Sequence, residues 1–104
     1  MTDQCHINEN MPEEEEIYDL ADFFKVFADS SRLKVLWALR HGEVCVTHLA
    51  EQLGMNTPAI SHQLQILRQK PLVRVRREGR KLYYRLADDH VQSILELGSE
   101  HMHE

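Results

Sequence analysis

The sequence lacks the features of a secreted or membrane-embedded protein. It has no long apolar run and no secretory pattern at its N-terminus, so we expect a cytoplasmic protein that does not engage a membrane. It has only two cysteines, Cys5 and Cys45. In a cytosolic chain these indicate free thiols or metal ligands rather than a disulfide framework.

The sequence also lacks the signatures of an enzyme. It has no glycine-rich loop that could cradle a phosphate, and no nucleophile stands in a recognisable arrangement with a base. We therefore expect neither catalysis nor a small organic substrate. The length of 104 residues suffices for one domain with a modest core, and chains this small often extend that core by forming a homodimer.

Charge is distributed unevenly along the chain. The net charge of −5 argues against a nucleic-acid partner, but eight acidic residues precede Phe23, and residues 86–104 contain five acids and no lysine or arginine. Residues 68–85, by contrast, contain eight basic residues and one acid, Glu78. A local basic surface matters more for phosphate binding than the total charge does, so this segment is a candidate DNA contact.

The residues around this segment follow the pattern of a helix-turn-helix. Leu49, Ala50 and Leu53 form an apolar stripe, and Gly54 stands where a residue with positive φ would end a first helix. A second helix begins at Asn56 or Thr57, either of which can accept hydrogen bonds from free amides. Its apolar residues recur at helical spacing and are expected to be buried: Ile60, Leu64 and Leu67.

The polar side chains of the second helix are suited to reading DNA. Hydrogen-bonding groups of this reach can contact base edges and phosphates. The predicted DNA contacts on this helix are Thr57, Ser61, His62, Gln63, Gln65 and Arg68. An ordinary polar helix surface is the alternative.

The segment after this helix predicts a β-hairpin wing and weakens that alternative. Apolar and basic residues alternate in two runs, 73–76 and 82–86, with the period of a strand, and Glu78-Gly79-Arg80 forms the turn. Basic side chains gather at the tip and its flanks: Arg76, Arg77, Arg80 and Lys81. Like charges packed this closely favour an anionic ligand such as the DNA backbone, and Arg77, Arg80 and Lys81 complete the predicted DNA contacts.

Four motifs together resemble the ArsR/SmtB family of bacterial metal-sensing winged-helix repressors. They are Ser61-His62-Gln63-Leu64, the turn Arg77-Glu78-Gly79-Arg80 leading to Tyr83-Tyr84, Ala28-Asp29-Ser30-Ser31-Arg32-Leu33, and Glu43-Val44-Cys45-Val46. The resemblance runs from about Leu20 to the C-terminus. It implies a homodimeric repressor that binds double-stranded DNA at an inverted repeat and loses its operator when metal binds.

The fold class expected is mainly α (α+β): four helices, a two-stranded hairpin and a fifth helix. Residues 1–11 form a flexible N-terminal arm, and 12–104 form the winged helix-turn-helix domain. The helix that opens near Pro12 has a wide aromatic face, which serves partly as a subunit contact or else only as core packing. The next helix, capped by Asp29 or Ser30 and ended by Gly42, is apolar on most sides, so we expect Trp37 in the core.

The last helix, from about Asp88, carries candidate metal ligands at both of its ends. His90 and His101 share a face but lie roughly 16 Å apart along the axis, so one helix cannot close a site with them. Two antiparallel copies related by a two-fold axis can, because opposite ends then lie side by side. The predicted quartet is Asp88 and His90 from one subunit with His101 and Glu104 from the other, and His103 is an alternative fourth ligand. This set suits tetrahedral Zn²⁺ or Co²⁺, with Ni²⁺ left open, and the resemblance implies the same intersubunit site.

A second metal site is suggested only by the resemblance. Some relatives use cysteines at the start of the first DNA-reading helix together with residues of the N-terminal arm. The corresponding candidates here are Cys45 and His48 with Cys5 and His6. Where soft-metal sensors have a second cysteine, this chain has Thr47, which disfavours a thiolate-only site. A buried structural Cys45 is the alternative.

The expected mechanism is derepression. The metal-free dimer places two reading helices in major grooves about 34 Å apart, and metal favours a dimer that no longer fits that spacing. The resemblance implies that an imidazole ligand passes the signal through its second nitrogen to a backbone carbonyl near Pro71. Two alternatives remain: a winged-helix regulator that senses redox state through Cys5 and Cys45, and a repressor that metal activates.

Overall fold

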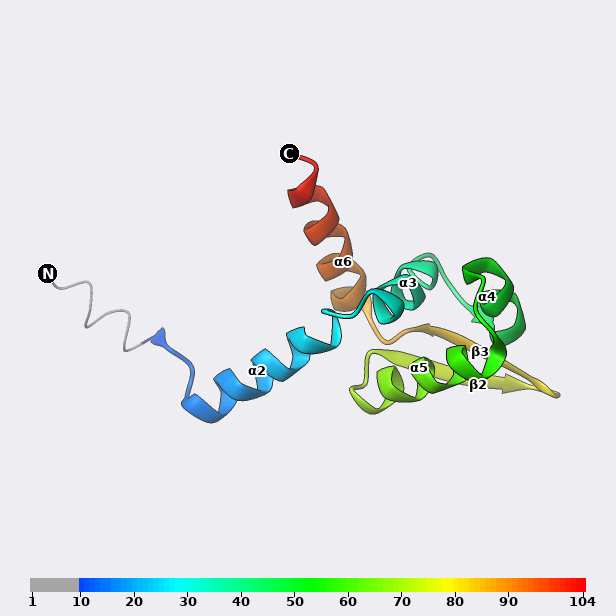
Figure 1. The fold of residues 1–104 in the computed structure, drawn as a ribbon. Helices are drawn as coiled ribbons and strands as arrows, with labels where there is room; N and C mark the ends of the chain where they lie inside the picture. The colour runs from blue at the N-terminus through cyan, green and yellow to red at the C-terminus, as the bar shows by residue number, and fades with distance from the viewer. Residues whose placement is uncertain (1–9) are drawn as a thin grey trace, which may run out of the picture.

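Five helices and three strands follow one another along residues 10–104, the part of the chain that the computed structural model describes. Their order is α2 (Glu14–Val26), α3 (Ser30–Ala38), β1 (Val44–Cys45), α4 (Val46–Leu53), α5 (Thr57–Gln69), β2 (Val73–Glu78), β3 (Lys81–Leu86) and α6 (Asp89–Met102). Helices α3, α4 and α5 gather with the sheet into one body, and α2 and α6 project away from it (Figure 1). The expected helix-turn-helix with a wing is confirmed. The predicted arm, residues 1–11, lies almost entirely outside the described residues.

The sheet has three antiparallel strands in the order β1-β3-β2, where two were expected. The additional strand, β1, pairs Val44 with Tyr84 and Cys45 with Tyr83. Two residues are too few to show a strand period, so this element exists only because β3 offers it a pairing edge. It places the start of α4 directly against the base of the wing.

The helix-turn-helix forms from local signals, as predicted. Gly54 ends α4 with φ of 65°, in the left-handed region that favours glycine. Asn56 then caps α5, because its side-chain Oδ1 accepts a hydrogen bond from the Ala59 amide at 2.8 Å. The turn is therefore determined by Gly54 and Asn56, the residues immediately before and after Met55.

The core lies between α3, α4, α5 and the sheet. Its fully buried side chains are Val35, Leu36, Leu39, Leu49, Ile60, Leu64, Leu67, Leu72 and Val73. Burial of each such leucine or isoleucine contributes about 1.5–3 kcal/mol relative to exposure. The three apolar residues predicted for the buried face of α5 are all in this set.

Trp37 is not in this core, and its predicted burial is wrong. Helix α3 ends at Ala38, earlier than the Gly42 predicted from sequence, and packs only one side of its apolar surface on α4 and α5. The other side leaves Leu33 at 39% and Trp37 at 37% exposure. The Arg40 guanidinium covers the Trp37 ring at 4.3 Å and donates to the Trp37 carbonyl. A helix that is apolar on most sides is buried only if other elements pack on all of those sides, and in the single chain α3 has neighbours on one side.

Helices α2 and α6 keep much of their apolar surface exposed. Val26 is the only fully buried residue of α2, and Phe23 and Phe27 pack partly against the core. The large exposed apolar residues on these two helices are Ile17, Tyr18, Leu20, Phe24, Leu97 and Met102. Within residues 10–104 no helix has the length and apolar character needed to cross a membrane.

Candidate nucleic-acid interface and metal centre

The solvent face of α5 presents the polar residues that sequence reasoning selected for DNA contact. Thr57, Ser61, His62, Gln65 and Arg68 are all exposed. The opposite face anchors the helix, since Ile60, Leu64 and Leu67 have no exposed surface. A rigid polar ridge of this kind can enter a major groove and offer donors and acceptors to base edges.

Gln63 differs from the other candidates on this helix. Its side chain is only partly exposed, and its Oε1 is buried without a hydrogen-bond partner among residues 10–104. It lies beside the buried stripe because position 63 is about 40° around the helix from Leu67 and about 60° from Ile60, on the side away from Ser61. The structure therefore does not place Gln63 on the exposed polar face.

Three basic residues at the tip of the wing and its flanks are free for phosphate. Glu78, the last residue of β2, lies opposite Lys81, the first residue of β3, in the strand register. Gly79, with φ of 64°, and Arg80 therefore form the turn between the two strands. Arg77, Arg80 and Lys81 are exposed, and none forms an ion pair with another described residue. Unpaired cations at a hairpin tip are well placed to neutralise DNA phosphates.

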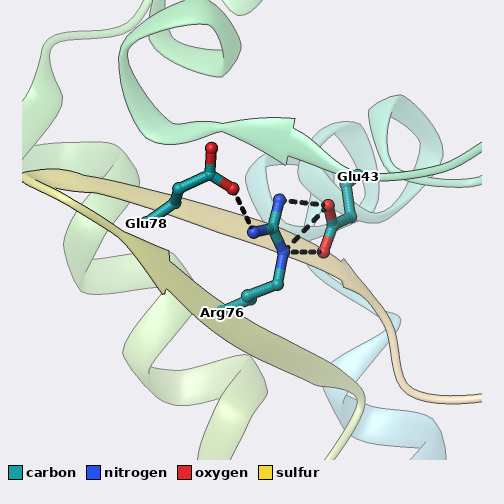
Figure 2. A network of polar contacts seen from close by, with 3 residues as sticks. All are labelled: Glu43, Arg76 and Glu78. Carbon is teal, nitrogen blue, oxygen red and sulfur yellow. Dashed lines mark hydrogen bonds and ion pairs between the residues drawn. The ribbon is translucent and has the colours of Figure 1, made fainter.

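Arg76, which sequence analysis grouped with these cations, is already engaged. Its guanidinium forms ion pairs with Glu43 and Glu78 (Figure 2). The hydrogen bonds to Glu43 and Glu78 raise the pKa of Arg76, and the bond to Arg76 lowers the pKa of Glu43. Sequence reasoning missed this contact because Glu43 and Arg76 are 33 residues apart and no local pattern joins them.

The first half of the predicted metal quartet lies at the N-terminus of α6. Asp88 caps the helix, with Oδ1 accepting hydrogen bonds from the amides of His90 at 3.0 Å and Val91 at 3.2 Å. The His90 Nδ1 lies 3.6 Å from the same oxygen, and both side chains are exposed. A carboxylate and an imidazole thus stand side by side at this end, with Asp88 Oδ2 directed to neither amide.

The second half lies at the opposite end of the same helix. His101 is exposed on the last turn and Glu104 is exposed just after the helix, where its amide donates to the His101 carbonyl at 3.4 Å. His103 is partly committed, because its Nδ1 lies 2.7 Å from the Ser99 carbonyl. Within residues 10–104 of one chain no three such side chains converge on a metal position. One chain by itself therefore does not assemble the predicted quartet, and the intersubunit site stays a prediction.

Cys45 is partly buried and free at the start of α4. Its Sγ lies 3.4 Å from the Thr47 hydroxyl, and this hydrogen bond is the main cause that lowers the pKa of the thiol. His48 is exposed nearby. Cys5 and His6 lie outside the described residues, so the second metal site and the redox pairing of the two cysteines both stay predictions.

An apolar groove runs between α2, α3 and α6. It has a volume of about 1070 Å³ and is lined by residues that include Phe24, Leu33, Trp37, Leu95 and Met102. Two exposed apolar side chains of the projecting helices, Phe24 and Met102, line this groove together with Leu33 and Trp37. Contiguous apolar surface of this kind marks a contact site.

Residues 29–75 match the bacterial regulatory protein family described as the arsR family. Over 85 residues the chain is 45% identical to the transcriptional repressor SmtB homolog of Synechocystis, covering 82% of this chain and 64% of that protein. It is 44% identical to the HTH-type transcriptional regulator NmtR of Mycobacterium tuberculosis, over 81% of this chain and 72% of that one.

Two solved structures share the fold. The AntR antimony-specific transcriptional repressor has a TM-score of 0.81 at 38% identity, over 90% of this chain and 86% of that one. The homodimeric winged helix-turn-helix DNA-binding domain Mb0332 of Mycobacterium bovis has a TM-score of 0.80 at 32% identity, over 91% and 90% of the two chains. The chain spans less than two thirds of the Synechocystis relative, at 64% of its length.

Proposed function

Because the chain belongs to the ArsR family of bacterial regulatory proteins, we propose that it is a metal-responsive transcriptional repressor that binds operator DNA as a homodimer. The family is one of transcriptional regulators rather than enzymes. The observation that carries the proposal is the exposed polar face of α5 beside a wing with unpaired basic side chains.

DNA contact divides between the two elements. Thr57, Ser61 and Gln65 present short and medium donors and acceptors for base edges in the major groove, with Arg68 on the same face and His62 beside it. On the wing the contacts are to flanking phosphates, through Arg77, Arg80 and Lys81. In a two-fold dimer the two reading helices meet an inverted repeat with half-sites about 34 Å apart.

A second copy covers the apolar surfaces of α2 and α6. Phe24 and Leu97 are more than half exposed in the single chain, at 52% and 63%. Burial of one such side chain contributes about 1.5–3 kcal/mol, so several of them favour association. The homodimeric neighbour Mb0332 supports the same assembly.

The metal centre lies between the two α6 helices of that dimer. Asp88 and His90 of one subunit meet His101 and Glu104 of the other, and His103 is the less suitable fourth ligand because its Nδ1 already contacts Ser99. Two imidazoles and two carboxylates suit Zn²⁺ best and Co²⁺ next, with Ni²⁺ also accommodated by these donors. A divalent ion bound there supplies a link between the two helices.

Control of DNA binding follows from where these ligands lie. The N-terminus of α6 follows β3 of the wing almost directly. A change at Asp88 and His90 therefore alters how the two winged helix-turn-helix units of the dimer are positioned relative to each other. Metal and DNA oppose each other by a coupling free energy that is typically about 1–3 kcal/mol. The second nitrogen of His101 passes the signal to a backbone carbonyl near Pro71, so His101→Gln keeps part of its metal affinity and loses derepression. Full metal-induced release of that variant from DNA would refute the relay.

The test is binding of the full chain to a short inverted-repeat duplex from its own promoter, followed by fluorescence anisotropy at one fixed salt concentration. Buffered Zn²⁺ should weaken binding by about tenfold or more relative to EDTA, which is about 1.4 kcal/mol. His90→Ala should abolish the zinc effect and leave binding in EDTA unchanged. Binding that is indifferent to zinc would reject the metal response but leave the DNA-binding proposal standing.

A further inference from the structure

Arg76 is engaged by two acidic neighbours within its own chain, and 47% of its side chain stays exposed. Its Nε lies 3.0 and 3.3 Å from the two carboxylate oxygens of Glu43, and its Nη2 donates to Glu43 at 2.9 Å. Its Nη1 donates to Glu78. The guanidinium lies 4.8 Å from the centre of the Tyr83 ring. All three nitrogens of the fork therefore face carboxylates, as Figure 2 shows.

This contact spans the whole sheet. Glu43 immediately precedes β1, Arg76 lies on β2, and β3 runs between them. Cys45, Tyr83 and Arg76 are consecutive cross-strand neighbours, so they share one face of the sheet. Because β1 leads directly into α4, the ion pair joins the wing to the beginning of the helix-turn-helix.

The neighbouring cations are in a different state. Arg77, Arg80 and Lys81 have no acidic partner in the part of the chain that the structure describes, whereas Arg76 has two. A phosphate that approached Arg76 would meet two carboxylates already bonded to its guanidinium, and their negative charge repels it. Among the described residues no carboxylate forms an ion pair with Arg77.

We propose that Glu43 and Glu78 withhold Arg76 from the DNA backbone, and that Arg76 is a positioning residue that holds the wing against the start of the helix-turn-helix. This rests on the proposed DNA-binding function and adds to it a division of labour among the wing cations. Arg77, Arg80 and Lys81 meet phosphate, and Arg76 orients the hairpin that carries them.

The salt dependence of binding distinguishes these roles, because each phosphate neutralised on duplex DNA contributes about −0.9 to the slope of log K against log salt. The probe is a fluorescein-labelled duplex of mixed sequence, about 30 base pairs long, titrated with the full chain between about 50 and 200 mM KCl. Arg77→Gln is the matched control, since it removes the adjacent cation that has no acidic partner.

Arg77→Gln should reduce the magnitude of the slope by about 0.9 per protomer, or about 1.8 per dimer. Arg76→Gln should leave the slope unchanged and weaken binding by less than about tenfold at every salt concentration, because only an exposed ion-pair tether is lost. If Arg76→Gln reduces the slope as much as Arg77→Gln does, Arg76 already contacts phosphate and the proposal is overturned.

A second experiment frees Arg76 from its two acidic partners. The Glu43→Gln/Glu78→Gln variant should gain slope of about 1.8 per dimer, an additional loss of affinity of about twelvefold between about 50 and 200 mM salt. Adding Arg76→Gln to that variant should remove the gain, and this comparison cancels the general effect of losing two acids. Equal slopes for the Glu43→Gln/Glu78→Gln variant and for the triple variant that also carries Arg76→Gln would overturn the proposal. No binding by the unmodified chain at about 50 mM salt would instead reject the DNA-binding function itself.

Discussion

Mixed dimers of two metal-binding variants give the most direct test of the intersubunit centre. His90→Ala removes a proposed ligand at the N-terminal end of α6, and His101→Ala removes a proposed ligand at the C-terminal end. Each homodimer then lacks an imidazole in both of its centres. In a mixed dimer the two losses fall in the same centre, so the other centre keeps all four ligands.

The expected magnitude follows from helix geometry and random pairing. The two imidazoles are roughly 16 Å apart along one helix, whereas metal–nitrogen bonds are about 2 Å long, so no single chain can restore a site. After equal amounts of the two variants exchange subunits, about half of the dimers are mixed and each has one intact centre. The mixture should therefore recover about one quarter of the wild-type capacity for tight metal binding.

The assay is a titration with Co²⁺, whose visible absorbance reports tetrahedral coordination, repeated with Zn²⁺ against a competing chelator. Native mass spectrometry of one tagged variant establishes that subunits have exchanged. The matched control mixes His90→Ala with Asp88→Ala. These losses lie in the same half of the centre, so every centre in their mixed dimer stays damaged and no capacity should return.

Two results would refute the intersubunit arrangement. One is a mixture that stays metal-free although mixed dimers have formed, which would mean that the ligands do not combine across the interface. The other is full capacity in either variant alone, which would mean that the removed histidine is not a ligand. Recovery in the Asp88→Ala control mixture would show that Asp88 does not bind the metal.

Three further predictions concern stability and reactivity. Asn56→Ala removes the cap of α5 and should lower the free energy of unfolding by about 1 kcal/mol in urea denaturation, while Asn56→Asp should retain most of it. Thr47→Val should raise the pKa of Cys45, so alkylation of Cys45 near neutral pH, measured in a Cys5→Ser chain, should become slower; an unchanged rate would mean that the hydroxyl does not stabilise the thiolate. Because Arg76 lowers the pKa of Glu43 in the folded chain, the ion pair stabilises the fold above the ordinary carboxyl pKa and is lost as pH falls through the lowered value. Glu43→Gln should therefore flatten the acid limb of the stability profile, and parallel acid limbs for the two proteins would contradict this.

Sequence alone determined the elements whose causes lie within a few residues. Gly54 and Asn56 bracket the turn of the helix-turn-helix, and the spacing of Ile60, Leu64 and Leu67 assigns the buried face of α5. The alternation in the wing likewise predicts its two strands, whereas the strand pairing shows that Gly79 and Arg80 alone form the turn. These features were predictable because helix capping, turn formation and side-chain periodicity are local interactions.

Tertiary structure decided what depends on partners far along the chain. Strand β1 exists only because β3 offers it an edge, and Trp37 is exposed because α3 packs on one side alone. Arg76 is identical in type to Arg77, yet Glu43, 33 residues away, gives it a different role. The proposed metal ligands depend in the same way on a partner, in this case a second copy of the chain. The donor types are legible in one chain, but opposite ends of α6 can meet only when a second copy brings them together, since no helix folds back on itself over roughly 16 Å.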